Sequence, residues 1–274
     1  QSEINGGYIT IEDLDNYQLQ EREPIIGSYR GHKIISMGPP SSGGIALVEA
    51  LNILEKFEFE KEEWHSSRHI HLVAEALKQA YADRAEHLGD EDYYPVPAEW
   101  LTSKDYSESI FEVITDIAIP SDSIFAGLSP SDGSEETTHY SVVDSYGNAV
   151  ATTTTINSLY GNKIVVDGAG FLMNNEMDDF SAQPGVPNQF GLLGGKANSI
   201  QPGKRMLSSM TPTIVLKDDR LYFVVGSPGG STIITTVLQI VLNILDFDMN
   251  IQEAIDAPRF HHQWKPEQFD YEEF

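Results

Sequence analysis

The sequence has no cysteine, and this absence excludes several kinds of chemistry at once. The chain has no disulfide framework, no thiol nucleophile and no cysteine-based metal site. It also lacks any run of 18 apolar residues, so we expect no membrane-spanning helix. No signal-like segment opens the chain, as if it were cut from a longer one. Because disulfide-free proteins occur on both sides of a bacterial inner membrane, the missing cysteines leave the compartment open.

Basic residues are scarce, since 17 lysines and arginines face 42 aspartates and glutamates, for a formal net charge of −25. So negative a chain is unsuited to nucleic acid or to anionic membrane surfaces, and we expect neither as a partner. The acidic surplus favours a solvated surface, with a cation-binding role as the alternative. The 274 residues are 40% hydrophobic, which is enough to build the core of one large domain or two small ones.

Histidines do not replace the missing cysteines as metal ligands. His65, His69 and His71 lie close together in the sequence, but they lack the third ligand and the general base expected of a zinc site with this spacing. His261 and His262 are adjacent, and adjacent residues do not share one face of a helix. We therefore interpret all five as packing or surface residues, and we predict no metal site.

Hydrophobic periodicity and turn residues predict a mixture of helices and strands without internal repeats. The clearest helix covers residues 66–88, where apolar residues recur at helical spacing and a serine can cap the start. Strands are expected at 24–37 and 211–226, and residues 161–173 offer strand material broken by glycines. Residues 184–204 form a long loop rich in glycine, proline and asparagine, and loops of this length often serve as lids.

Residues 137–157 (TTHYSVVDSYGNAVATTTTIN) organise the second half of the chain. Two alternating runs flank a turn near Gly147, which predicts a β-hairpin. The polar, acidic loop at 128–136 leads directly into it and is an accessible place for chain cleavage. A cut before Thr137 would give that threonine a free α-amine beside its own hydroxyl, and the amine could act as the base for nucleophilic attack. The alternative is that this threonine serves only the β-propensity of the strand.

Two double glycines precede predicted helices, Gly43–Gly44 and Gly229–Gly230. A glycine turn at a helix start presents backbone N–H groups to negative charge. The first pair could bind an anion or form a plain turn, and the second could stabilise an oxyanion. A polar cluster at 174–180 directly follows an apolar run, where ligand-binding groups often gather; a solvated loop is the alternative.

Longer motifs resemble those of one protein family. The stretches that carry the resemblance are GPPSSGG, AYADRAEHLGD, TTHYSVVDSYGNAVA, NNEMDDFSAQPGVPN, RMLSSMTPTIV, GSPGGSTIITTVLQ and APRFHHQW. They resemble the γ-glutamyltranspeptidases, which are N-terminal nucleophile hydrolases, and the similarity covers almost the whole chain. The resemblance implies an α+β fold, namely a four-layer αββα sandwich with two antiparallel sheets between helix layers, present here as an incomplete copy.

The resemblance also implies a proenzyme that cleaves its own bond between Glu136 and Thr137. Residues 1–136 would be the C-terminal part of the large subunit. Residues 137–274 would be the small, catalytic subunit, truncated at its C-terminus, and both would share one structural domain. Thr137 would be both the cleaving group and the catalytic nucleophile.

Further residues receive roles from the same resemblance. Thr155 would hydrogen-bond the nucleophile, and Gly229 and Gly230 would supply the oxyanion-hole amides. A γ-glutamyl group carries an ammonium and a carboxylate on its α-carbon; carboxylates suit the first, and hydroxyls backed by an arginine suit the second. The family motifs place Asn157, Glu176 and Asp179 at the ammonium and Ser208 and Ser209 at the carboxylate.

The implied activity is that of a γ-glutamyl transferase and hydrolase acting on glutathione and other γ-glutamyl amides, with water, an amino acid or a peptide as acceptor. No cofactor is implied, and the implied location is periplasmic or secreted. Two alternatives stay open at this point. One is a related cephalosporin or glutaryl acylase of the same fold, and the other is a catalytically silent, unprocessed fragment.

Two departures from the family pattern affect the predicted site. The arginine that binds the substrate carboxylate in the family lies in an upstream segment outside this chain. Phe190 stands where many members carry a lid-loop tyrosine that hydrogen-bonds across the site. Phenylalanine has no hydroxyl for that bond, so the closure of the pocket must differ.

Overall fold

The computed structural model of the chain describes residues 2, 6–124 and 137–273. Its helices and strands follow in chain order as α1 (Ile11–Asn16), β1 (Ile25–Tyr29), β2 (His32–Ser36), α2 (Gly43–Leu54), η2 (Lys61–Glu63), α3 (Ser67–His87), α4 (Ala98–Leu101), α5 (Lys104–Phe111), η3 (Ser121–Ser123), β3 (Thr138–Val143), β4 (Ala149–Thr154), η4 (Glu176–Asp179), η5 (Lys196–Asn198), β5 (Thr213–Lys217), β6 (Arg220–Val225), α6 (Thr232–Leu245), α7 (Ile251–Asp256), β7 (Phe260–His261) and β8 (Asp270–Tyr271).

Four strands form one antiparallel sheet in the order β1-β2-β5-β6. Arg30 and Gly31 join β1 to β2, and Asp218 and Asp219 join β5 to β6, with φ between 47° and 76° at all four residues. Two successive residues with positive φ make the tight hairpin turn whose twist matches that of the flanking strands. The strands expected at 24–37 and 211–226 are thus confirmed.

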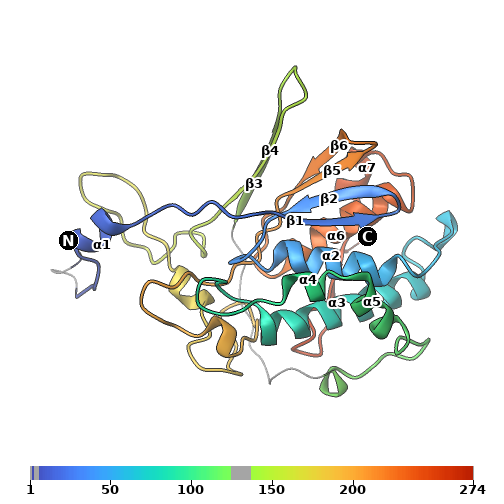
Figure 1. Cartoon of the computed structure of the whole chain (residues 1–274), viewed down its shortest axis with the longest axis horizontal. Coiled ribbons are helices and arrows are strands. Elements are labelled where there is room, and N and C mark those ends of the chain that lie inside the picture. The colour runs from blue at the N-terminus through green and yellow to red at the C-terminus, as the bar shows by residue number, and fades with distance from the viewer. Residues whose placement is uncertain (1, 3–5, 125–136, 274) are drawn as a thin grey trace.

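A layer of helices covers this sheet (Figure 1). Helix α2 lies directly against β1 and β2, and α3, α5 and α6 pack against α2. Every residue of α2 is buried, and burial of each of its leucine and isoleucine side chains contributes roughly 1.5–3 kcal/mol to stability. Helix α3 confirms the helix expected at 66–88. The Ser66 side chain caps its start, as predicted, by accepting a hydrogen bond from the His69 amide.

The double glycine at the start of α2 serves close packing. A Cβ on Gly43 would lie 2.3 Å from the carbonyl oxygen of Met210, and one on Gly44 would lie 2.3 Å from that of Met37. The amide of Gly44 donates to the Met37 carbonyl (3.1 Å), and that of Gly43 donates to the Ser41 hydroxyl (3.3 Å). These amides are therefore used within the fold, which agrees with a plain turn and brings the segment around Met210 against α2.

The hairpin of β3 and β4 stands apart from the main sheet as a two-stranded sheet of its own. It contacts β5 and β6, where the His139 ring lies so close to Gly226 that a Cβ there would come within 2.2 Å of it. The register pairs Thr138 with Thr154. Thr137 and Thr155 therefore face each other just beyond the last pair of the hairpin.

These elements confirm the predicted α+β class. The described residues hold a helix layer, a four-stranded sheet and the two-stranded sheet of β3 and β4, which are the parts that an incomplete αββα sandwich would retain, together with a short pair formed by β7 and β8. The strand material expected at 161–173 is reduced to a single bridge between Val165 and Leu172, because Gly161, Gly168 and Gly170 all have positive φ and break the extended backbone. Within the described ranges, no helix is long and apolar enough to cross a membrane.

The histidines near the start of α3 pack among aromatic rings. His69 is 1% exposed and meets the edges of Phe59 and Phe247 at centroid distances of 5.2 and 4.9 Å. The His65 ring stacks on Trp64 at 4.1 Å, and the His65 amide donates to His69 Nδ1. Across the described part of the chain, no group of three or more potential ligands is placed to hold a metal ion.

We expect the burial of His69 to make the fold sensitive to acid. Burial, and to a smaller extent the nearby His65, lowers the pKa of His69 from 6.5 to about 4. Between about pH 4 and 6.5, this histidine is therefore protonated in the unfolded chain and neutral in the folded chain. Stability falls by about 1.4 kcal/mol per pH unit from this residue as the pH drops from about 6.5 towards 4, then levels off.

The change His69→Gln removes that titrating group and keeps an acceptor for the His65 amide. Urea unfolding of the wild-type and variant proteins at several pH values should show a shallower pH dependence for the variant between pH 4 and 6.5. Above pH 7.5 the two slopes should coincide, whatever the variant costs in absolute stability. Equal slopes in the acidic window would contradict the assignment of acid sensitivity to His69.

Candidate active site

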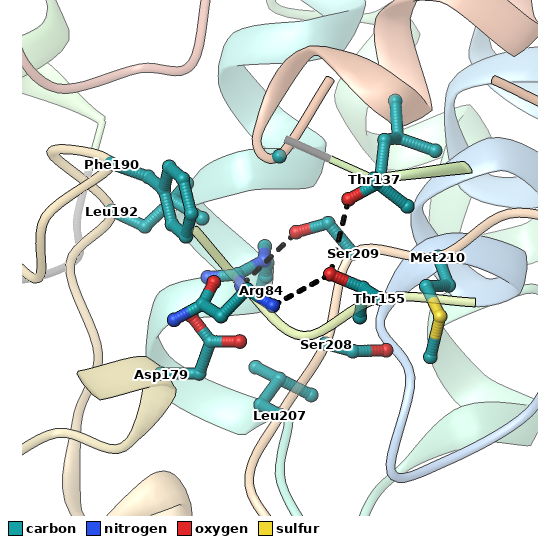
Figure 2. A pocket seen from close by; sticks show the side chains of 13 residues that line it. Arg84, Thr137, Thr155, Asp179, Phe190, Leu192, Leu207, Ser208, Ser209 and Met210 are labelled. Atoms are coloured by element: carbon teal, nitrogen blue, oxygen red, sulfur yellow. Dashed lines mark hydrogen bonds between the residues drawn. The ribbon is translucent and has the colours of Figure 1, made fainter. Parts of the chain in front are cut away.

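One pocket gathers most of the residues singled out in the sequence (Figure 2). Its empty space, counted out to the solvent at its mouth, is about 320 Å³. Seven predicted site residues line it: Thr137, Thr155, Asn157, Asp179, Ser208, Ser209 and Gly230. Glu176 is not among the lining residues but shares the turn η4 with Asp179, Gly229 directly precedes Gly230, and Glu136 lies outside the described residues.

Thr137 and Thr155 meet at the open end of the β3–β4 hairpin. The Thr137 hydroxyl donates to Thr155 Oγ1 at 3.4 Å. Thr155 Oγ1 in turn accepts the backbone amide of Asn157 at 2.8 Å, so its position is fixed by the turn that follows β4. In the unbroken chain, the nitrogen of Thr137 belongs to a peptide bond and has no basic lone pair. The hydroxyl can gain an adjacent amine as base only when that bond is cut.

The loop between β6 and α6 brings Gly230 to the pocket. Gly229 has a φ of +129° and Gly230 a φ of +50°, values that favour glycine because it has no Cβ to clash. The Gly229 carbonyl accepts bonds from the Thr232 amide (2.8 Å) and hydroxyl (2.9 Å). Because the C=O and N–H of one trans peptide point in opposite directions, the Gly230 amide is directed away from the start of α6.

An acidic pair lies at one side of the pocket. Glu176 and Asp179 occupy the turn η4, and both are largely buried. Burial, with the Glu176 carboxyl beside it, raises the pKa of Asp179, while the charge of Arg84 opposes this rise. Burial also raises the pKa of Glu176, one of whose oxygens has no hydrogen-bond partner among the described residues. A bound ammonium would supply the positive charge that this pair lacks.

Two serines also line the pocket, and Arg84 lies between Asp179 and Ser209 (Figure 2). Arg84 is 4% exposed and donates from Nε to the Ser42 hydroxyl (3.0 Å) and from a terminal nitrogen to the Ser209 hydroxyl (3.4 Å). The Ser208 hydroxyl is buried and has no partner within the described part of the chain. The Ser208 carbonyl accepts the amide and hydroxyl of Ser42, which holds this strand-like segment against α2.

Arg84 is not among the residues predicted from the sequence, although it lies within the AYADRAEHLGD motif. The predicted apolar face of the helix at 66–88 includes Leu77 and Tyr81. Arg84 follows Leu77 by seven residues and Tyr81 by three, so it lies on the same face. A charged residue in the middle of an apolar face is the signal that would have found it, because such a residue is buried only when its charge has partners.

Phe190 forms part of the pocket wall together with other apolar side chains, namely Leu192 of the same loop, Leu207 and Met210 before β5, and Ile233 of α6. The Asn188 side chain accepts the amides of Phe190 and Leu192, and the Gln263 side chain donates to the Phe190 carbonyl at 3.1 Å. The loop expected at 184–204 is therefore pinned by side chains at its centre. The Phe190 ring closes the pocket wall by packing, without the hydroxyl that a tyrosine would supply.

Comparisons with known proteins agree with this geometry. The sequence profile of the Gamma-glutamyltranspeptidase family matches residues 1–274. The glutathione hydrolase proenzyme of Escherichia coli (strain K12) is 56% identical over 266 residues, which cover 96% of this chain and 46% of that protein. The acylase ACY 1 proenzyme of Pseudomonas sp. (strain SE83) is 42% identical and covers 93% of this chain and 43% of that protein.

A solved structure supports the fold. The cephalosporin acylase from Bacillus halodurans superposes with a TM-score of 0.76 at 29% identity, over 95% of this chain and 44% of that one. The chain thus spans about half the length of the curated relatives it matches. Because the family profile and the relatives cover nearly all of the present sequence, the chain belongs to the gamma-glutamyltranspeptidase family.

Proposed function

We propose that the protein to which this chain belongs is a γ-glutamyl transferase and hydrolase that acts on glutathione and other γ-glutamyl amides. The observation that carries the proposal is one pocket lined by Thr137, by Asp179 of the buried acidic pair, and by Ser208 and Ser209, with Arg84 donating to the Ser209 hydroxyl. This charge pattern complements an α-carbon that bears one ammonium and one carboxylate. Water, an amino acid or a peptide is the acceptor.

Activation begins at the bond between Glu136 and Thr137. The Thr137 oxygen attacks the Glu136 carbonyl carbon, the C–N bond breaks, and the nitrogen takes the hydroxyl proton as an ester forms. Water then hydrolyses the ester, leaving a carboxylate on Glu136 and a free amine on Thr137. That amine becomes the general base for the same hydroxyl.

Catalysis repeats this chemistry on the substrate. The Thr137 amine accepts the hydroxyl proton while the oxygen attacks the γ-carbonyl carbon, and the developing oxyanion is stabilised by the amides of Gly229 and Gly230. The leaving amine departs with the proton, and a γ-glutamyl ester remains on Thr137. Water or an acceptor amine then attacks the ester, with the Thr137 amine again as base. Thr155 holds the nucleophile in place throughout.

We infer the two subunits and the location from family membership. Residues 1–136 form the C-terminal part of the large subunit, and residues 137–274 form most of the small subunit, within one domain. The hairpin side chains Val142 and Val150 are 52% and 54% exposed, which suits coverage by further strands of the whole protein. We propose a periplasmic or secreted enzyme.

The competing function is a glutaryl or cephalosporin acylase, which is favoured by the similarity to acylases. Substrates of that kind need no α-ammonium contact. The acidic pair, whose pKa values are raised, would then meet no substrate cation and would have only the charge of Arg84 to offset its own, and burial of carboxylates with so little compensation is costly. The pair therefore favours the γ-glutamyl group.

Two anilides that differ by one ammonium group test the proposal in the full-length protein. We expect kcat/KM for the γ-glutamyl anilide to exceed that for the glutaryl anilide by about 100-fold, since a buried ionic hydrogen bond contributes up to about 3 kcal/mol. Asp179→Asn should reduce this ratio to about tenfold or less. Asp178→Asn, a change at the exposed neighbouring position, is the matched control and should keep it. A preference for the glutaryl anilide would instead identify an acylase.

A further inference from the structure

Tyr81 connects α3 to the loop that carries the two glycines. The side chain is 2% exposed, and its hydroxyl donates to the carbonyl oxygen of Ser231 at 2.5 Å. The ring meets His261 edge-on, at a centroid distance of 5.9 Å and an angle of 87°. Tyr81 lies one helical turn before Arg84, so the same face of α3 reaches both the glycine loop and the serine side of the pocket.

The bond from Tyr81 is the first link of a relay through two peptide groups. The Ser231 carbonyl belongs to the same peptide as the Thr232 amide, and in a trans peptide these two groups point in opposite directions. Tyr81 holds the carbonyl end, and the amide end donates to the Gly229 carbonyl at 2.8 Å. The Gly229 carbonyl in turn shares its peptide with the Gly230 amide, so its direction sets the direction of that amide.

The glycine loop depends on such external support. Gly229 and Gly230 have no side chains, and their positive φ values of +129° and +50° lie where glycine moves between conformations at little cost. Ser231 makes no capping hydrogen bond from its side chain to the first turn of α6. A loop of this composition keeps one orientation only when its carbonyls are held from outside.

We propose that Tyr81 is a positioning residue that keeps the Gly230 amide aimed at the oxyanion. This inference rests on the proposed role of the two glycines. Preorganised donors act on charge that develops in the transition state, whereas the acidic pair and the Arg84-backed serines bind the ground state. Loss of the Tyr81 hydroxyl therefore slows acylation while leaving substrate binding nearly unchanged.

The test uses the full-length protein with the change Tyr81→Phe, which keeps the ring and removes one donor. Acylation by a γ-glutamyl anilide is followed in single turnovers and normalised to the amount of protein cleaved before Thr137. We expect the rate constant to fall about tenfold to 100-fold, less than the loss of a whole oxyanion donor. The substrate concentration for half-maximal rate should change by less than about twofold.

Tyr29→Phe is the matched control. Tyr29 is also fully buried, and its hydroxyl donates to Asp246 at 2.6 Å, away from the pocket-lining residues. The Tyr29→Phe variant should have a lower thermal stability and an unchanged rate of acylation. Thr232→Val provides a second test, because the Thr232 hydroxyl is the other donor to the Gly229 carbonyl. The Thr232→Val variant should also slow acylation selectively. This test does not depend on whether the Tyr81→Phe variant folds.

The outcomes separate this inference from the proposed function. A wild-type protein that does not turn over γ-glutamyl anilide would contradict the proposed function itself. An active wild type whose Tyr81→Phe and Thr232→Val variants acylate at the normal rate would overturn only the role of Tyr81. The role of Tyr81 would also be overturned if the substrate concentration for half-maximal rate rose by the same factor as the rate constant fell. A similar slowing by Tyr29→Phe would overturn it too, because both results would show a general structural effect.

Discussion

Replacing Thr137 with alanine in the full-length protein will leave a single uncleaved chain and reduce anilide hydrolysis by about 10⁴-fold or more. Both effects have one cause, because the same oxygen attacks the Glu136 carbonyl and later the substrate carbonyl. Losses of this size accompany removal of a covalent nucleophile. Denaturing gel electrophoresis detects the cleavage, and release of the aniline measures the activity.

Thr138→Ala is the control for this prediction, because Thr138 is the adjacent threonine and the first residue of β3. It should give two fragments and an activity close to that of the wild type. Thr137→Ser keeps a hydroxyl at the same position and should retain cleavage at a reduced rate. Normal cleavage in Thr137→Ala, or its loss in Thr138→Ala, would show that the nucleophile has been assigned to the wrong threonine.

The change Arg84→Met should lower kcat/KM for the γ-glutamyl anilide by about 100-fold and destabilise the fold by roughly 3 kcal/mol, as expected when one member of a buried charge network is removed. The Ser42 and Ser209 hydroxyls lose their donor. The pKa of Asp179 rises further, because Arg84 is the charge that holds it down. Since the ionised carboxylate binds the ammonium, the activity of the variant should recover partly as the pH increases.

Arg30→Met separates the two effects. Arg30 lies in the turn between β1 and β2 and pairs with Asp246, at the end of α6, at 2.9 Å. Neither residue lines the pocket. This variant should lose stability but keep its kcat/KM, as measured by urea unfolding and by steady-state kinetics at several pH values. An Arg84→Met protein with normal kcat/KM, or with a loss no greater than that of Arg30→Met, would contradict a role for Arg84 in the site.

Local patterns predicted those parts of the fold that depend on nearby residues. The alternation around Gly147 predicted the hairpin, and the neighbouring positions of Thr137 and Thr155 follow from its register. The segment at 161–173 was expected as strand material broken by glycines, and it keeps only one bridge because three of those glycines have positive φ. β-Propensity describes the average preference of a residue, whereas the conformations of these glycines are set by the turns in which they lie.

The composition of the pocket depended on tertiary packing that no local pattern contains. The motifs identified Thr137, Asp179 and Ser209 through resemblance, but only the fold shows that α3 supplies Arg84 beneath them. A helix face with helical apolar spacing is normally interpreted as core, and a single arginine on it is easily passed over. Its partners, Ser42 and Ser209, lie 42 residues before it and 125 residues after it in the sequence.

The central claim is that Thr137 carries the γ-glutamyl group, and intact-mass spectrometry tests it directly. The cleaved full-length enzyme is mixed with a γ-glutamyl anilide and quenched with acid within the first turnover. We predict that the fragment beginning at Thr137 gains the mass of one γ-glutamyl group, while the fragment ending at Glu136 keeps its mass. An adduct on the other fragment, or turnover by a chain that was never cut before Thr137, would contradict the account.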